Sequence, residues 1–109
     1  MSINYHLLIE QLLIEQVSTL KQSSNLDWSV IIDAEHDHFI LLKTGWQNIT
    51  RVCLPHLYIR LENGKVWIEQ DETHAGFALK LQAVGVPSQD IVLGFHQPHI
   101  RKLTPYAVD

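Results

Sequence analysis

Residues 57–70, LYIRLENGKVWIEQ, contain the clearest structural pattern in the sequence. Two runs that alternate apolar and polar residues flank the pair Asn63-Gly64. Such a pair between two alternating runs favours a type I′ turn, because both central residues of that turn adopt positive φ. The stretch therefore predicts an antiparallel hairpin with one strand at about 51–61 and the returning strand at 66–70. Leu57, Ile59 and Leu61 are expected on one face of the first strand.

The alternation with a period of two continues toward the N-terminus. Residues 28–33 alternate in this way, and the polar turn at 35–38 separates them from a second run at 39–44. Gly45 is expected to end that second strand. Because short turns join all four runs, the sequence predicts an antiparallel meander of about four strands.

Helical patterns lie on both sides of the predicted sheet. Residues 3–22 contain no Pro or Gly and are rich in Leu, Ile, Glu and Gln, which favours a long helix. A second helix is expected to begin after Thr73 as its N-cap and to end at Gly85, with Pro87 as the stop. Residues 91–95 are either a fifth short strand or a buried extended segment, and an irregular tail follows. The prediction is one α+β domain over residues 1–109.

The first predicted helix has more apolar surface than one sheet face requires. Its polar residues occupy an arc of roughly 60°, and apolar residues take most of the remaining circumference. Either a second copy of the chain or its own C-terminal segment is needed to cover the surplus. We expect a homodimer, with an interface formed by Leu8, Ile9, Leu12 and Leu13.

Charge and composition argue against direct contact with nucleic acid. The net charge is −4, and the eight Lys and Arg residues are scattered, with only Arg101-Lys102 adjacent. Binding DNA through its phosphates requires clustered cations. The N-terminus has no basic leader and no apolar run approaches the length of a membrane span, so we expect a cytoplasmic protein without a membrane segment.

The seven histidines do not form an evident metal site. His36 and His38 share a polar turn, and His96 and His99 lie on either side of Pro98. Each pair offers two ligands where structural zinc takes about four. The sequence therefore predicts no metal and no cofactor.

No catalytic constellation is evident either. Cys53 has no suitably placed base and is expected to be buried and inert. The glycine spacing fits no phosphate-binding loop, and no Gly-x-Ser-x-Gly elbow occurs. An enzyme would need a deep pocket lined by His56, Tyr58 or His96. The protein is predicted not to be an enzyme.

Trp67 is the aromatic residue with the clearest functional alternative. It points away from Val66 and Ile68 in the predicted strand, next to charged positions. It is either a binding anchor or a core residue beneath the second helix.

From Gly45 onward the order of motifs resembles the XisI family, the fdxN element excision controlling factors of filamentous cyanobacteria. The resemblance covers nearly the whole chain, and it is loose over the first 30 residues and tight over the last 25. Its motifs are Gly45-Trp46, Arg51-Val52, residues 63–68 (NGKVWI), Gly85-Val86-Pro87, residues 90–96 (DIVLGFH), Pro98, Arg101-Lys102, Thr104 and Ala107-Val108.

The resemblance implies an accessory, non-enzymatic role in programmed DNA excision, beside a site-specific recombinase and a companion protein called XisH. We predict that Trp67, His96, Arg101 and Lys102 contact that partner. The alternative for the tail is that it only seals the sheet or the first helix. The alternative function is that of a direct DNA-binding recombination cofactor.

The chain departs from the family pattern at two places. Family members often carry His and then an acidic residue on the third strand, where this chain has Tyr58 and Arg60. The family's turn at 36–38 tends to be rich in Arg, whereas this chain has His36 and His38 there.

Overall fold

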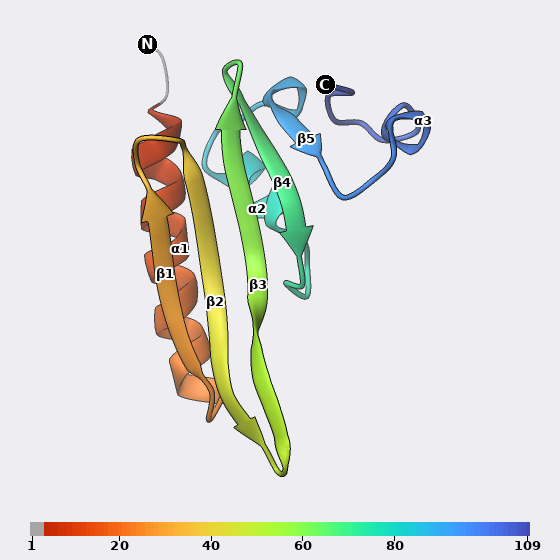
Figure 1. Cartoon of the computed structure of the whole chain (residues 1–109). Coiled ribbons are helices and arrows are strands. Elements are labelled where there is room, and N and C mark those ends of the chain that lie inside the picture. The colour runs from red at the N-terminus through yellow and green to blue at the C-terminus, as the bar shows by residue number, and fades with distance from the viewer. Residues whose placement is uncertain (1–3) are drawn as a thin grey trace.

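The computed structural model describes residues 4–109. Its elements follow the order α1 (Tyr5–Ser23), β1 (Asp27–Asp33), β2 (His38–Gln47), β3 (Thr50–Glu62), β4 (Lys65–Asp71), α2 (Phe77–Ala83), the 3-10 turn η1 (Ser88–Asp90), β5 (Ile91–Leu93) and α3 (Pro98–Arg101). The strands form one sheet in the order β1-β2-β3-β4-β5 (Figure 1). The predicted α+β class is confirmed.

The first four strands form the predicted antiparallel meander. The turn between β3 and β4 has φ of 53° at Asn63 and 74° at Gly64, as a type I′ turn requires. The prediction that Gly45 ends the second strand is wrong, because β2 continues to Gln47. Gly45 has a φ of 142°, and a Cβ there would lie 2.9 Å from Leu26 Cδ2, so glycine serves a close packing contact rather than a strand end.

The fifth strand is short and parallel to β4. α2 forms part of the crossover between them, since parallel neighbours cannot be joined by a tight turn. Beyond β5 the tail turns back, and Ala107 forms a parallel bridge with Val92. The Ala107 amide donates to the Ile91 carbonyl at 2.8 Å. The tail therefore adds a further backbone contact at the β5 edge of the sheet.

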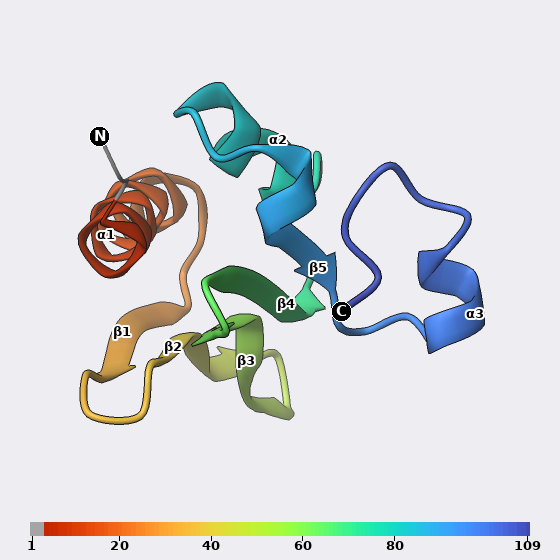
Figure 2. The same cartoon turned by 90° about the horizontal axis from the view of Figure 1, so that it is seen from above.

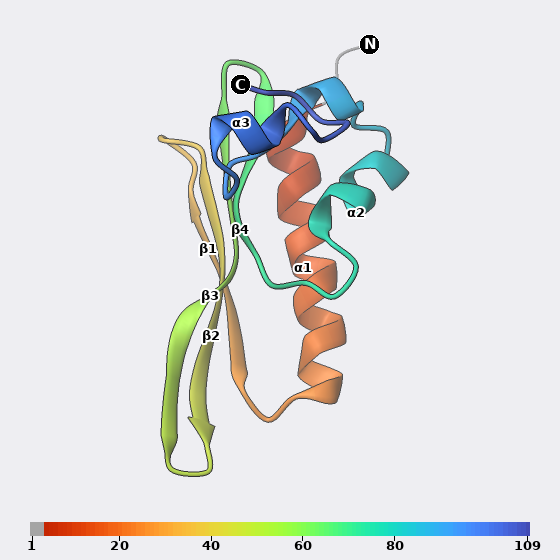
Figure 3. The same cartoon turned by 90° about the vertical axis from the view of Figure 1, so that its right-hand side faces the viewer.

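Both α1 and α2 lie on one face of the sheet, α1 over β1 and β2 and α2 over the β4 side (Figures 2 and 3). The core lies between these two layers and is formed by buried residues of α1, α2 and the strands, among them Ile9, Leu13, Phe39, Leu41, Leu57, Ile59, Ile68, Phe77 and Leu81. Among residues 4–109, no helix covers the central strands on the opposite face, which we call the open face (Figure 3).

The predicted interface residues of α1 belong largely to this core. Ile9 and Leu13 are fully buried, Leu12 is buried, and Leu8 packs partly buried against the core. For Ile9 and Leu13 the prediction of contact with a second copy is therefore corrected, because the sheet already covers them. The large apolar residues that α1 exposes are Leu7 and Ile14.

The ends of the helices show which capping predictions hold. Asn4 caps α1, because its side chain accepts a hydrogen bond from the Leu7 amide at 3.1 Å. The predicted helix began at position 3, which lies outside the described residues. The prediction of Thr73 as cap of α2 is wrong, because Gly76 occupies the N-cap position. The Asp71 carboxylate accepts from the Phe77 amide at 2.6 Å. Gly85 does end α2: its φ is 104°, and the Val86 amide returns to the Leu81 carbonyl.

No helix within residues 4–109 is long and apolar enough to cross a membrane.

Candidate functional site

Trp67 lies on the open face, not beneath α2. Antiparallel pairing places it directly opposite Arg60 of β3, and parallel pairing places it beside Val92 of β5. Its neighbours in sequence, Val66 and Ile68, are fully buried on the helix side. The alternative that Trp67 packs under the second helix is therefore wrong.

Two guanidinium groups lie over the Trp67 indole. The Cζ atom of Arg60 is 4.5 Å from the ring centroid, and that of Arg101 is 5.2 Å away. Cation–π contacts of this kind contribute about 0.5–1 kcal/mol at exposed sites and more where water is excluded. Trp67 thus joins the middle of the sheet to the C-terminal tail.

Arg60 is held by two carboxylates. Its Nε donates to Glu69 at 2.7 Å, and its Nη1 lies 2.8 Å from a carboxylate oxygen of Glu62. The hydrogen bond to Glu62, and then the one to Glu69, raise the pKa of Arg60 above its ordinary value. Gly94 leaves room for this arrangement, because a Cβ at that position would lie 2.9 Å from a carboxylate oxygen of Glu69.

Arg101 is used within the chain to hold the tail. Its Nε donates to the His96 carbonyl at 2.9 Å and its Nη1 to the Val108 carbonyl at 3.2 Å. The two bonds connect parts of the tail to each other, and the contact with Trp67 connects the tail to β4. Arg101 was predicted to contact a partner, but its guanidinium group already makes these contacts within the chain.

The other predicted tail residues lie close by. The His96 ring is 4.5 Å from the ring of Phe95 and is partly buried, whereas Lys102 is exposed. Phe95 and Leu103 are also exposed, and Leu103 retains 81% of its accessible surface. We call Phe95, His96, Lys102 and Leu103 the tail surface. The structure thus brings His96, Arg101 and Trp67 together and leaves Lys102 exposed at their margin.

Sequence reasoning missed Arg60, Glu69 and Gly94 as parts of this cluster. The signal for Arg60 was present, since a two-residue turn at 63–64 fixes the register and places residue 60 opposite residue 67. Nothing local indicates Glu69 and Gly94, because a bulge in the β3–β4 pairing and the parallel strand bring them together.

The positions that depart from the family pattern are neighbours in space. His38 and Arg60 are direct cross-strand partners. The Tyr58 hydroxyl lies 2.8 Å from Nδ1 of His38 on the same face. The turn at 36–38 and the third strand therefore contact each other at these positions.

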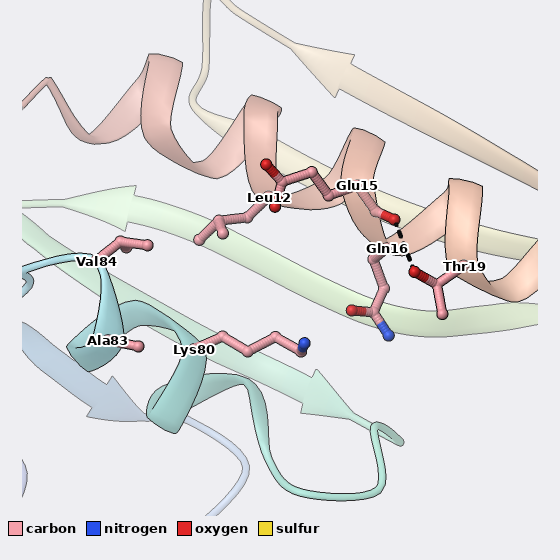
Figure 4. Close-up of a pocket in the computed structure, with 7 residues that line it drawn as sticks. All are labelled: Leu12, Glu15, Gln16, Thr19, Lys80, Ala83 and Val84. Atoms are coloured by element: carbon pink, nitrogen blue, oxygen red, sulfur yellow. Dashed lines mark hydrogen bonds between the residues drawn. The ribbon is translucent and has the colours of Figure 1, made fainter.

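One cavity of about 250 Å³ lies between α1 and α2 (Figure 4). Its lining is Leu12, Glu15, Gln16, Thr19, Lys80, Ala83 and Val84. None of His56, Tyr58 and His96, the residues that an enzymatic pocket was expected to use, contributes to it. Within residues 4–109, no group of three or more His, Cys, Asp or Glu side chains is arranged to hold a metal ion.

The remaining reactive residues lie elsewhere. The prediction of a buried Cys53 is wrong, since this thiol is exposed on β3. His56 is half-buried, with its ring 5.0 Å from and nearly perpendicular to that of Trp28, and its Nδ1 has no hydrogen-bond partner among the described residues. Burial, and then the charge of Lys43, lower the pKa of His56.

Comparison with known proteins agrees with this architecture over nearly the full length. The XisI protein family matches residues 2–108. The crystal structure of a XisI-like protein from Anabaena variabilis is 31% identical, covers 96% of each chain and superposes with a TM-score of 0.88. That of the fdxN element excision controlling factor XisI from the same organism is 32% identical, with 96% of each chain covered and a TM-score of 0.80. No curated protein matches the chain.

The family match spans the meander, the parallel fifth strand and the tail that closes over Trp67. This chain is a member of the XisI family.

Proposed function

We propose that this protein is a non-enzymatic accessory factor for excision of a DNA element, and that it acts by binding a companion XisH-like protein. Membership in the XisI family and the likeness to an excision controlling factor support the first part. The net charge of −4 favours a protein partner over the phosphate backbone of DNA.

The observation that carries the binding proposal is the way in which the tail is held. Arg101 fixes the tail against Trp67 and two backbone carbonyls, and this leaves the apolar side chains of Phe95 and Leu103 exposed beside Lys102. A preorganised surface of apolar residues beside a cation loses little conformational entropy on binding. Such a surface fits a protein partner, in the excision complex or in a recombinase assembly.

The test is co-expression with the XisH-like protein followed by size-exclusion chromatography. We expect the two proteins to elute together, and Leu103→Glu with Lys102→Glu to abolish co-elution. Lys21→Glu on the last turn of α1 is the matched control, because it reverses an exposed charge far from the tail. Arg101 is a poor choice for this test, since its loss would release the tail as well as a charge.

Two results would contradict the proposal. One is separate elution of the two wild-type proteins at micromolar concentration. The other is a gel shift with element-border DNA that weakens steeply as salt rises, which is the behaviour of a direct DNA-binding cofactor.

A homodimer remains a prediction. Because Ile9 and Leu13 are buried, an α1 interface would have to use Leu7 and Ile14. Light scattering measures the mass directly, and a monomer at micromolar concentration would refute dimerisation through this helix.

A further inference from the structure

The open face carries an apolar surface at a distance from the tail. Strand register aligns Ile31, Ile40 and Tyr58 in one row across β1, β2 and β3. The next row contains Leu42 opposite Pro55, the following row Thr44 opposite Cys53, and the last Trp46 opposite Arg51. Ile31 retains 47% of its accessible surface and Trp46 62%. We call Ile31, Ile40, Leu42, Trp46 and Arg51 the open-face patch.

The strands beneath this patch are apolar on both sides. Val30-Ile31-Ile32 and Phe39-Ile40-Leu41-Leu42 are continuous apolar runs, and only alternate members of each face the helices. An antiparallel sheet with one face in water usually alternates apolar and polar residues. Continuous runs are typical of strands that are covered on both faces. The open-face patch therefore resembles a surface that a second layer covers.

Charge indicates the chemistry of that layer. Residues 38–61, which form β2, its turn and nearly all of β3, contain no Asp or Glu, although the chain has 12 acidic residues. Arg51 lies with its Cζ 5.6 Å from the Trp46 ring centroid and donates to the Gly45 carbonyl at 3.4 Å. No salt bridge joins Arg51 to a carboxylate within residues 4–109. The cation therefore lacks an ionic partner, and a protein docked on the patch could supply one.

We propose that the open-face patch docks an apolar element of the companion protein, with a carboxylate of that protein against Arg51. The inference rests on the proposed function and assigns it a second contact surface. Exposed Trp and Arg side chains are the residue types that dominate the binding energy of protein interfaces. A second copy of the chain would present the same carboxylate-free strands. The carboxylates that a second copy would bring on this face of β1 are Asp27 and Asp33. Asp33 already binds His36 at 2.8 Å, so Asp27 is the one that such a copy would offer to Arg51.

The experiment measures the affinity of the purified XisH-like protein for single variants by titration calorimetry. Ile31→Lys and Arg51→Glu are each expected to weaken binding at least tenfold. Leu79→Lys is the matched control, because Leu79 is 57% exposed on α2, which covers the other face of the sheet. Its affinity should stay within twofold of wild type. If Ile31→Lys does not fold, the affinity of Ile31→Thr is measured instead, because threonine retains strand propensity.

Each outcome decides a separate point. If the wild-type protein binds and the open-face variants bind equally well, the patch is refuted and the proposed function stands. If the wild-type protein does not bind, both are refuted. If Ile31→Lys converts a dimer to a monomer without changing the affinity for the companion, a second copy covers the patch and the inference fails.

Discussion

Replacement of Arg101 by Met removes one guanidinium and keeps most of the aliphatic stem. Three contacts disappear with it: the bond to the His96 carbonyl at 2.9 Å, the bond to the Val108 carbonyl at 3.2 Å, and the stack on Trp67 at 5.2 Å. All three connect the tail to itself or to the sheet. The substitution therefore tests how strongly the tail is held.

The magnitude follows from the burial of each contact. The bond to His96 is partly buried and involves a charged donor, so it contributes about 1.5 kcal/mol. The bond to Val108 is exposed and adds little, and the cation–π contact adds about 0.5 kcal/mol. A loss of about 2 kcal/mol raises the equilibrium constant for tail opening by roughly 30-fold.

Hydrogen–deuterium exchange resolves this opening. The Ala107 amide donates to Ile91 across the junction of tail and sheet, and its exchange should rise by roughly 30-fold. The amide of Ile59, in the middle of the sheet, should exchange as in the wild type, because opening of the tail leaves β3 paired. Lys102→Met is the control, since it removes a neighbouring exposed cation. Exchange at Ala107 within threefold of wild type would refute the assignment of Arg101 as the residue that holds the tail.

Three further substitutions test the fold around the site by denaturant titration. Asp71→Ala should lower the free energy of unfolding by about 2 kcal/mol, because its carboxylate accepts from the Phe77 amide at the start of α2; a loss below about 0.5 kcal/mol would contradict this cap. Burial lowers the pKa of His56, so the unfolded chain binds that proton more readily and stability falls as pH drops through about 6.5. His56→Gln should reduce the fall in stability below about pH 6.5. An unchanged dependence of the free energy of unfolding on pH would refute the assignment of this effect to His56. Gly45→Ala should cost about 1–3 kcal/mol, because φ is 142° and the new Cβ would meet Leu26 at 2.9 Å; wild-type stability would contradict that contact.

The hairpin and its neighbours could be predicted because local chemistry determines them. The Asn63-Gly64 turn requires positive φ at two successive residues, and this requirement fixes both the turn and the register of β3 and β4. Alternation predicted that Trp28 and Ile31 lie on opposite faces of β1, and the structure places Trp28 toward the helices and Ile31 away from them. Alternation likewise placed Trp67 on the face opposite Val66 and Ile68, but it left open which of the two faces the second helix covers.

Contacts between distant segments could not be predicted in this way. Thr73 has the local character of a cap, yet Asp71 binds the first amide of α2 because the chain bends between β4 and that helix. Gly45 resembles a strand end, yet it accommodates Leu26 from the segment between α1 and β1. Cys53 is exposed because it alternates with the buried Val52 and therefore lies on the open face of β3.

The surplus of apolar residues in α1 was interpreted as a second interface, but a large share of it belongs to the core. Ile9 and Leu13 pack against the sheet, and Leu12 faces the cavity beside α2. α2 lies beside α1 and covers part of its apolar surface, and a helical wheel of α1 alone cannot show this contact. On α1, Leu7 and Ile14 remain exposed, and a separate apolar surface lies on the open face of the sheet.

The parallel fifth strand has a consequence for the order in which the chain folds. The four strands of the meander meet through short turns, whereas β5 reaches β4 only after α2 and η1, and Ala107 joins β5 later still. Non-local pairings form late because loop closure precedes their stabilising contacts. We therefore expect stopped-flow kinetics to separate the two regions. Arg101→Met should accelerate unfolding and leave the refolding rate unchanged, whereas weakening the turn at Asn63-Gly64 should slow refolding.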